Sequence, residues 1–311
     1  MNMKNMKIKY IILLVIFLLK GIDSIAQQVP HYSQFWFNDF VTNPAFAGTK
    51  PYYQAKSNNR YQWVGVNDSP KTFILSAFGP EKKKDMGYGV QLFSDVTGPT
   101  SRLGFYGSYA YNLKLKDDIR LSLGVSLGLL QYKIDGSQIT LHDDNDASLG
   151  HEVYAEFVPD ADFAILVYSG KWHGGIVAKQ LFNYTLDFDD VNALGINTLK
   201  THFFAHGAYR YDINEDWATE PFVLLKFMAP TPLQVDLGLR AIWKKMAWIG
   251  ASWRSADAIA IMIGYEYEEQ ISFGYSYDIT MSNLSTVSSG THEIMIGFKF
   301  SKIKQDEETK L

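Results

Sequence analysis

The densest group of potential metal ligands in this sequence is His142-Asp143-Asp144-Asn145-Asp146. Oxygen ligands supplied by one loop are what Ca²⁺ prefers in proteins. The cluster nevertheless lacks the glycine and the distal glutamate of the calcium-loop pattern. We therefore favour a solvated loop over a calcium site, and we expect no bound metal or cofactor.

Two further groups of side chains could support zinc binding or catalysis. The imidazoles of His173, His202, His206 and His292 show no HExxH or other paired zinc spacing, so hydrogen bonding is the simpler interpretation. The stretch Gly274-Tyr275-Ser276-Tyr277-Asp278 is not GxSxG, and no helical pattern follows it. A surface hydrolase that brings Ser276 and His292 together from separate strands stays open as an alternative without a motif. We predict a protein that is not an enzyme.

The composition excludes several other classes of protein. Cysteine is absent, which removes disulfides, thiolate zinc sites and cysteine nucleophiles. The formal net charge of -4 comes with no dense Lys/Arg tract, so we expect no nucleic-acid partner. Aromatic residues make up 15% of the chain, glycine contributes 24 residues, and charged residues reach only 20%. This aromatic and glycine excess is typical of the walls of β-barrels.

The N-terminus has the three parts of a secretory signal peptide, which are a basic region, a short apolar run and a small-residue cleavage site. In this chain they are Lys4, Lys7, Lys9, the run 11–19, Ser24 and Ala26. We predict a signal peptide over 1–26 and a mature chain from Gln27. An uncleaved N-terminal anchor is the alternative, but the apolar run is too short to cross a bilayer comfortably.

From residue 57 onward apolar side chains recur with a period of two, the signature of strands with two unlike faces. In Leu121 to Leu129 every odd position is a large aliphatic residue, and every even position is serine or glycine. About fourteen such strands are predicted, at 57–66, 72–78, 86–95, 100–114, 119–134, 162–169, 171–179, 202–213, 217–228, 234–243, 246–253, 258–267, 271–277 and 293–300. We therefore predict an all-β fold, a transmembrane antiparallel β-barrel over 57–300. An N-terminal periplasmic or plug segment (27–56) precedes it, and a polar tail (301–311) follows.

The predicted connections alternate between short and long, as in outer-membrane barrels with periplasmic turns and longer outer loops. The tight ones are 114–118, 169–170, 214–216, 244–245 and 268–270, and 81–85 is the longest on that side. The long ones are 135–161, 180–201 and 278–292. A soluble β-sandwich has no reason to sort its loops in this way. We therefore place the protein in the cell outer membrane, in contact with its lipid, with both chain ends in the periplasm.

Charged side chains are costly at the middle of a membrane, so those within strands should point into the lumen. The predicted lumen residues are His173, Lys179, His206, Arg210, Glu220, Lys226, Asp236, Arg240, Glu266 and Glu293. Leucine, isoleucine and aromatic residues of the other face should meet lipid. Tyrosine and tryptophan near strand ends, such as Trp217, Trp243 and Tyr267, suit the interfacial girdles.

The aromatic segment before the first strand has two interpretations. As a functional site it would dock a partner chain through Tyr32, Gln34, Phe35, Trp36, Phe46 and Arg60. As a structural element, Asn43-Pro44 and Gly48 make a turn while the aromatic side chains pack into the barrel mouth. We favour the structural role, although both can hold at once.

Several blocks of the sequence carry a family resemblance. The N-terminal block is His31-Tyr32-Ser33-Gln34-Phe35, then Asn43-Pro44-Ala45-Phe46-Ala47-Gly48, then Arg60 and Gln62-Trp63. Later blocks are Thr97–Ser101, Glu220-Pro221 through Lys226, Arg254 with Asp257-Ala258, and Gly274–Asp278 followed by Gly290–Ile294. In order and spacing these blocks, which span nearly the whole mature chain, resemble the PorP/SprF family. Its members are outer-membrane proteins linked to the type IX secretion system and gliding motility of Bacteroidota.

The resemblance implies a non-enzymatic barrel that works with type IX secretion components. It also implies binding of a large secreted, adhesin-like cell-surface protein, which the barrel helps to export or anchor. From the loop pattern and the family blocks together we expect contact at the long outer loops 135–161, 180–201 and 278–292, with the lumen as a second candidate. The alternative from another class is a porin-like channel that passes small solutes. A barrel of about fourteen strands can be either filled or open, so the two hypotheses differ in what the lumen holds.

Overall fold

The computed structural model describes residues 29–82, 85–139, 152–186 and 198–300. The predicted signal peptide, the acidic cluster 142–146 and the predicted tail 301–311 lie outside these residues. None of the described helices is long and apolar enough to cross a membrane. The helical elements are the short α2 (Asp39–Thr42) and the 3-10 turns η1 (Pro44–Phe46), η2 (Gly136–Gln138) and η3 (Asn283–Thr286).

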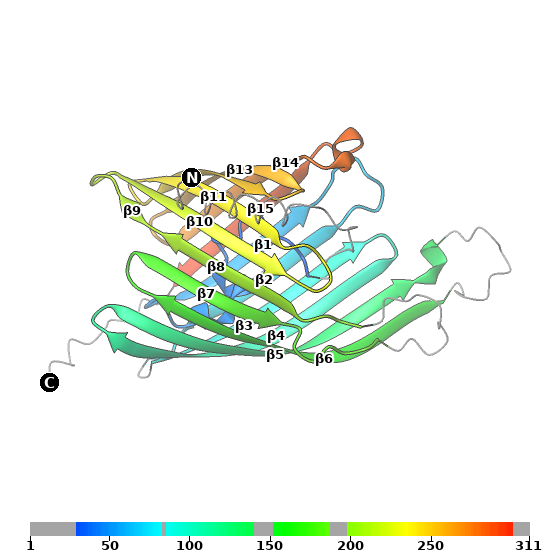
Figure 1. The fold of residues 1–311 in the computed structure, drawn as a ribbon, viewed down its shortest axis with the longest axis horizontal. Coiled ribbons are helices and arrows are strands. Elements are labelled where there is room, and N and C mark those ends of the chain that lie inside the picture. The colour runs from blue at the N-terminus through cyan, green and yellow to red at the C-terminus, as the bar shows by residue number, and fades with distance from the viewer. Residues whose placement is uncertain (1–28, 83–84, 140–151, 187–197, 301–311) are drawn as a thin grey trace, which may run out of the picture.

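The strands form one antiparallel sheet that closes on itself (Figure 1). They are β1 (Tyr53–Tyr61), β2 (Lys71–Pro80), β3 (Met86–Thr97), β4 (Thr100–Lys116), β5 (Ile119–Asp135), β6 (Val153–Tyr168), β7 (Trp172–Lys179), β8 (His202–Tyr209), β9 (Tyr211–Asp212), β10 (Trp217–Phe227), β11 (Gln234–Trp243), β12 (Ala247–Arg254), β13 (Ala258–Tyr267), β14 (Ile271–Thr280) and β15 (Thr291–Phe300). Closure comes from the pairing of β1 with β15. Since β8 and β9 are successive pieces that both pair with β10, the described wall has fourteen strand positions. The predicted β-barrel of about fourteen strands is confirmed.

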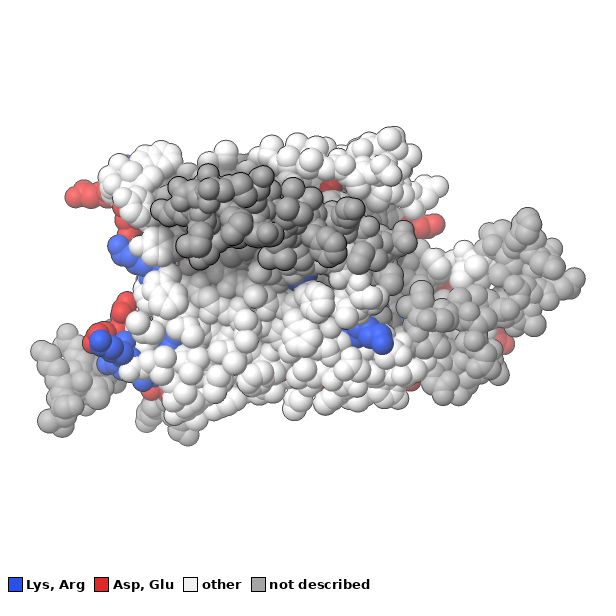
Figure 2. Space-filling view, viewed as in Figure 1, with Lys and Arg blue, Asp and Glu red and all other residues white. Residues whose placement is uncertain are grey.

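Side chains alternate between the lumen and the outer surface because successive residues of a strand point to opposite faces. In β5, Ser122 is fully buried on the lumen side, whereas Leu127 on the outer side is 64% exposed. Leu103, Phe105, Ile249 and Phe273 are exposed on other strands in the same way. Figure 2 shows charged side chains gathered towards the left-hand end of the barrel and sparse along the wall. An apolar outer surface between charged ends is what a bilayer requires.

The predicted start of the barrel at residue 57 is wrong, because β1 begins at Tyr53 and ends at Tyr61. Both faces of this strand carry polar residues. Lys56 and Asn58 point into the lumen, while Ser57 and Asn59, which alternate with them, lie on the outer side. A period of two in hydropathy is therefore invisible there, although the burial alternates regularly. Residues 62–66, predicted as strand, belong to the connection between β1 and β2.

The sixth strand also differs from the prediction, since β6 begins at Val153 and not at residue 162. Residues 153–161, predicted as loop, pair with β5 in an extended hairpin. Pro159 and Asp160 interrupt the apolar pattern of this stretch, yet Asp160 points into the lumen like the serines of β5. The connection after β5 is consequently 136–152, shorter than predicted.

The connections sort to the two ends of the barrel (Figure 1). The end with the short connections, here the turn end, has 81–85, 117–118, 169–171, 213–216, 244–246 and 268–270. The other end, here the loop end, has 62–70, 98–99, 136–152, 180–201, 228–233, 255–257 and 281–290. Two of these are tight turns, 98–99 with Gly98 at φ +52° and 255–257 with Ala256 at φ +57°, and the other five are longer. By the rule for outer-membrane barrels, the loop end faces the cell exterior.

Candidate functional site

Residues 29–52, here the lumen segment, cross the inside of the barrel from the loop end to the turn end. Near its start, Ser33 contacts Asp278 and Glu293, which lie close to the loop ends of β14 and β15. Near its finish, the Ala47 carbonyl accepts a hydrogen bond from Asn112 at the turn-end part of β4. The chain then enters β1 at the turn end. The start of the described chain therefore lies at the loop end, away from the periplasmic side on which the sequence placed it.

Aromatic side chains hold the lumen segment against the wall. Trp36 meets Trp248 edge-on with ring centroids 4.7 Å apart, and Phe40 stacks on Phe78 at 4.5 Å. Phe35 meets the ring of Phe222 edge-on at 5.6 Å. Burial of one such side chain stabilises a fold by about 1.5–3 kcal/mol. Several of them together place the lumen segment within the buried core of the barrel.

Two glycines of the wall leave room for the backbone of the lumen segment. A Cβ added to Gly87 would lie 2.2 Å from the Ala47 carbonyl carbon, and a Cβ added to Gly124 would lie 2.5 Å from the Ala45 nitrogen. No side chain fits at such distances. Gly87 and Gly124 thus mark where the backbone of the lumen segment touches the wall.

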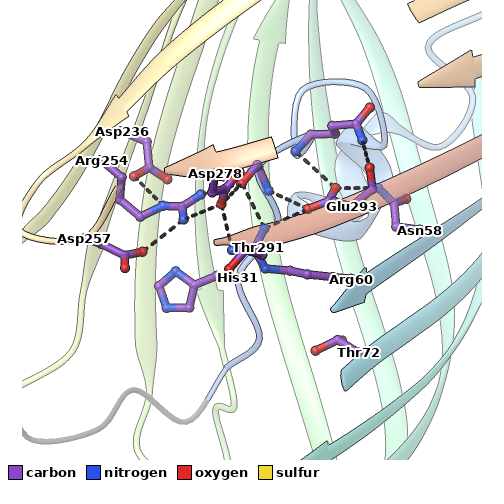
Figure 3. Close-up of polar contacts among 12 residues, drawn as sticks. His31, Asn58, Arg60, Thr72, Asp236, Arg254, Asp257, Asp278, Thr291 and Glu293 are labelled. Carbon is purple, nitrogen blue, oxygen red and sulfur yellow. Dashed lines mark hydrogen bonds and ion pairs between the residues drawn. The ribbon is translucent and has the colours of Figure 1, made fainter. Parts of the chain in front are cut away.

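A cluster of buried charges lies in the loop-end half of the lumen (Figure 3). We name it the lumen ion cluster, and it consists of Arg60, Asp236, Arg254, Asp278 and Glu293. Arg60 pairs with Asp278 at 2.9 Å and with Glu293 at 3.2 Å. Arg254 pairs with Asp236 at 3.1 Å and with Asp278 at 3.4 Å. These side chains are almost fully buried, so each charge depends on its partners inside the lumen.

The lumen segment is bonded to this cluster through neutral groups. The Ser33 hydroxyl donates to Asp278 Oδ2 at 2.6 Å and accepts from Arg60 at 2.9 Å and from Arg254 at 3.0 Å. The Ser33 backbone N–H donates to Glu293 at 2.8 Å, and the Gln34 side chain donates to the Glu293 carbonyl at 3.1 Å. One serine thereby joins strands β1, β12, β14 and β15.

The predicted lumen residues divide into two groups. Lys226, Asp236 and Glu293 lie in or beside the cluster, with Lys226 3.4 Å from Asp236 and 3.0 Å from His31. The others lie in separate contacts: Lys179 pairs with Asp162, Glu220 with Arg240, His173 with Phe46, His206 with Asn43, Glu266 with Lys299, and Arg210 with Asp212. Arg210 and Glu266 lie at the turn end, where their pairs are partly exposed.

Sequence reasoning did not select Ser33, Arg254 or Asp278 as site residues. Arg254 and Asp278 stand near the ends of their strands, where alternation gives the weakest indication of direction. Ser33 lies outside any alternating stretch. All three nevertheless occur in the blocks that carry the family resemblance, and membership in these blocks is the feature of the sequence that could have identified them as site residues.

The six residues predicted to dock a partner are covered in this structure. Gln34, Phe35, Trp36, Phe46 and Arg60 are buried, and Tyr32 is partly buried. Their contacts are with the wall and with one another, for example the guanidinium of Arg240 4.2 Å from the ring of Trp36. This is the arrangement that the structural interpretation expects. Their role as a docking surface stays a prediction.

The residues considered for catalysis do not meet. Ser276 is buried on the lumen side of β14, where its register partner is Glu293. His292 lies on the outer side and hydrogen-bonds to the Tyr275 hydroxyl at 2.7 Å. Because the two side chains point to opposite faces of the wall, they cannot form a catalytic pair. Within the described ranges, no three or more His, Cys, Asp or Glu side chains are placed to hold a metal.

The lumen segment leaves a small cavity against the wall. A cavity of about 60 Å³ lies in the loop-end half, beside Val29, Tyr32, Arg102, Tyr106 and Gln180. A space of this size suits a few water molecules, which would bond to polar atoms such as the unpartnered Gln180 Oε1. It is too small to serve as a path for solutes.

Comparison with known proteins agrees with this architecture. A family model described as type IX secretion system membrane protein PorP/SprF matches residues 24–298. No curated protein matches the chain in sequence. Among solved structures, the CymD monoaromatic hydrocarbon channel is similar with a TM-score of 0.50 and 11% identity, over 91% of this chain and 96% of that one. The Pseudomonas putida toluene transporter TodX has a TM-score of 0.48 and 7% identity, over 92% of this chain and 96% of that one. At 11% identity, the likeness to CymD shows the barrel fold alone.

Proposed function

The chain belongs to the PorP/SprF family of type IX secretion system membrane proteins, and from this premise we propose that it binds a large secreted cell-surface protein and helps to export or anchor it. The partner is an adhesin-like protein that reaches the cell surface, and the barrel acts without catalysis. The family implies association with type IX secretion components. The barrel fold and the family place the protein in the outer membrane.

The filled lumen is the observation that carries this proposal over a solute channel. The lumen segment occupies the barrel from the loop end to the turn end, and its aromatic side chains are buried against separate strands of the wall, for example against Phe78 of β2 and Trp248 of β12. Expelling it would expose several aromatic side chains at about 1.5–3 kcal/mol each. A barrel filled in this way acts as a scaffold, and its two ends are the surfaces it offers to a protein partner outside the membrane.

The loop end is the surface that supports binding from outside the cell. The loops 62–70 and 281–290 are joined there by two backbone hydrogen bonds between Val64 and the pair Ser289 and Gly290. Val287 stands exposed on this joined surface, with 61% of its area accessible. We infer that Val287 is available there to contact a protein partner, and a charge at this position tests that contact.

Affinity purification from the native outer membrane in mild detergent, followed by mass spectrometry, tests the proposal. We expect a large secreted surface protein or type IX secretion components to be retained. The variant Val287→Asp should retain less of the surface protein than the parent. The matched control is Leu115→Asp, which changes a similarly exposed leucine (57%) at the turn end and should leave retention unchanged. Recovery of the barrel alone from the parent strain would contradict the proposal.

Conductance in planar bilayers tests the channel alternative directly. Since the lumen segment fills the barrel, the purified parent protein should give no stable open pore. A steady conductance from the intact chain would favour the porin-like function over the closed scaffold.

A further inference from the structure

A groove of about 380 Å³ runs along the outer surface of the wall across β6, β7, β8 and β10. Its lining is almost wholly apolar, and it includes Phe163, Ile176, Ala178, Phe203, Ala205 and Phe227. Phe163, Phe203 and Phe227 are each about half exposed on the face that meets lipid. The groove is thus a depression in the membrane-facing surface and is separate from the lumen cavity.

The strand register explains why the wall is hollow at this point. Ala178 lies directly between Phe163 of β6 and Phe203 of β8, and Phe203 in turn faces Phe227 of β10. In the neighbouring row Ala205 lies between Ile176 and Leu225. Since side chains in one row are neighbours on one face of the sheet, each alanine leaves a gap between larger residues. Two adjacent rows with such gaps make one continuous depression.

The groove lies in the part of the wall that faces the outer leaflet. Ala178 is the penultimate residue of β7, Phe203 is the second residue of β8, and Phe227 is the last residue of β10. These positions are all next to the loop end. Because the loop end faces the cell exterior, a lipid of the outer leaflet meets the groove first.

We propose that this groove binds one fatty acyl chain of an outer-leaflet lipid. The groove is continuous with the lipid-exposed wall, so acyl chains reach it without crossing a polar surface. An extended protein segment would bring unpaired backbone N–H and C=O groups into hydrocarbon, which is strongly unfavourable. A helix, about 10–12 Å across, is wider than the gap between Phe163 and Phe203, which stand two strand spacings of about 4.8 Å apart.

Native mass spectrometry tests the proposal with palmitoyl-oleoyl-phosphatidylethanolamine as the probe. The purified barrel is loaded with this lipid in detergent, and retention is followed as collision energy rises. The parent should keep one lipid at energies that strip the rest of the annular lipid. The variant Ala178→Leu/Ala205→Leu fills both gaps with larger apolar side chains and should lose that lipid at least tenfold more readily.

The matched control is Ala241→Leu/Ala251→Leu, which enlarges two outward alanines of β11 and β12 away from the groove. It should keep the lipid like the parent. A heat-dependent shift in gel migration checks that all three barrels are folded. Equal retention by the filled variant, no retained lipid on the folded parent, or a second copy of the chain in place of the lipid would each overturn the proposal.

Discussion

Replacement of Arg60 by methionine tests whether the lumen ion cluster stabilises the barrel through paired buried charges. The guanidinium of Arg60 pairs with Asp278 at 2.9 Å and with Glu293 at 3.2 Å, and all three side chains are at most 2% exposed. Methionine keeps much of the apolar stem but removes the charge. Asp278 then keeps Arg254, whereas Glu293 keeps only neutral donors such as Asn58.

The size of the expected effect follows from what remains unpaired. Removing one partner of a buried ion pair typically costs about 3–5 kcal/mol, because the other charge stays buried without compensation. In the Arg60→Met variant Asp278 still has a cationic partner and Glu293 still accepts hydrogen bonds. We therefore expect this variant to lower the free energy of unfolding by about 3 kcal/mol, near the lower limit of that range. The double variant Arg60→Met/Glu293→Gln removes the stranded charge as well. It should be destabilised by less than the sum of the single variants.

The assay is urea unfolding in phospholipid vesicles, followed by tryptophan fluorescence, for which Trp36 and Trp248 report from the lumen. Arg210→Met is the control, since it removes an arginine from the partly exposed pair with Asp212 at the turn end. Exposed ion pairs contribute little, so this variant should unfold like the parent. If Arg60→Met proves no less stable than Arg210→Met, the buried pairs do not stabilise the fold and the reasoning fails.

Three further predictions concern the lumen segment. The chain has no cysteine, so a single introduced cysteine can be labelled selectively. Val29→Cys should react with a membrane-impermeant maleimide on intact cells, whereas Lys50→Cys should react only after the outer membrane is opened. The reverse pattern would contradict the direction of the lumen segment. Gly124→Val should prevent the segment from seating and lower the thermal stability of the barrel, while Gly107→Val, at a position with open space, should have a much smaller effect on the same melting curve. Deletion of 29–50 should produce a conducting pore in planar bilayers where the full chain produces none, and a silent deletion variant that is folded would show that other groups close the lumen.

The strands of the wall were predictable from sequence where one face carries large apolar side chains and the other carries serine or glycine. The run Leu121 to Leu129 is such a case, and its residues alternate between lipid and lumen as expected. In β1 the outer residues Ser57 and Asn59 are polar, and the strand is revealed only by its pairing with β2 and β15. Tertiary pairing therefore decides strand boundaries where hydropathy is uniform.

The candidate site was less predictable, for a physical reason that Ser33 illustrates. Alternation within a strand assigns a side chain to the lumen, but it carries no information on which lumen residues meet across the barrel. Arg60 was selected for a docking surface and Glu293 for the lumen, yet the two form one ion pair. The path of the lumen segment likewise depends on space left by glycines such as Gly87 and Gly124. The sequence does not show which glycines leave this space, because the contacts form only in the closed barrel.

The pairing of β1 with β15 joins the strands that are most distant in sequence, so its formation carries the largest loop-closure entropy cost among the strand pairs. The lumen segment bridges this seam. Asn38 bonds to Asn58 on one side at 2.8 Å, and the backbone of Ser33 bonds to Glu293 on the other. The lumen segment thus holds β1 and β15 together from inside the barrel. The same contacts therefore fix the lumen segment and reinforce the closing seam, so a chain that lacks residues 29–50 should still close its barrel, but with a weaker seam between β1 and β15.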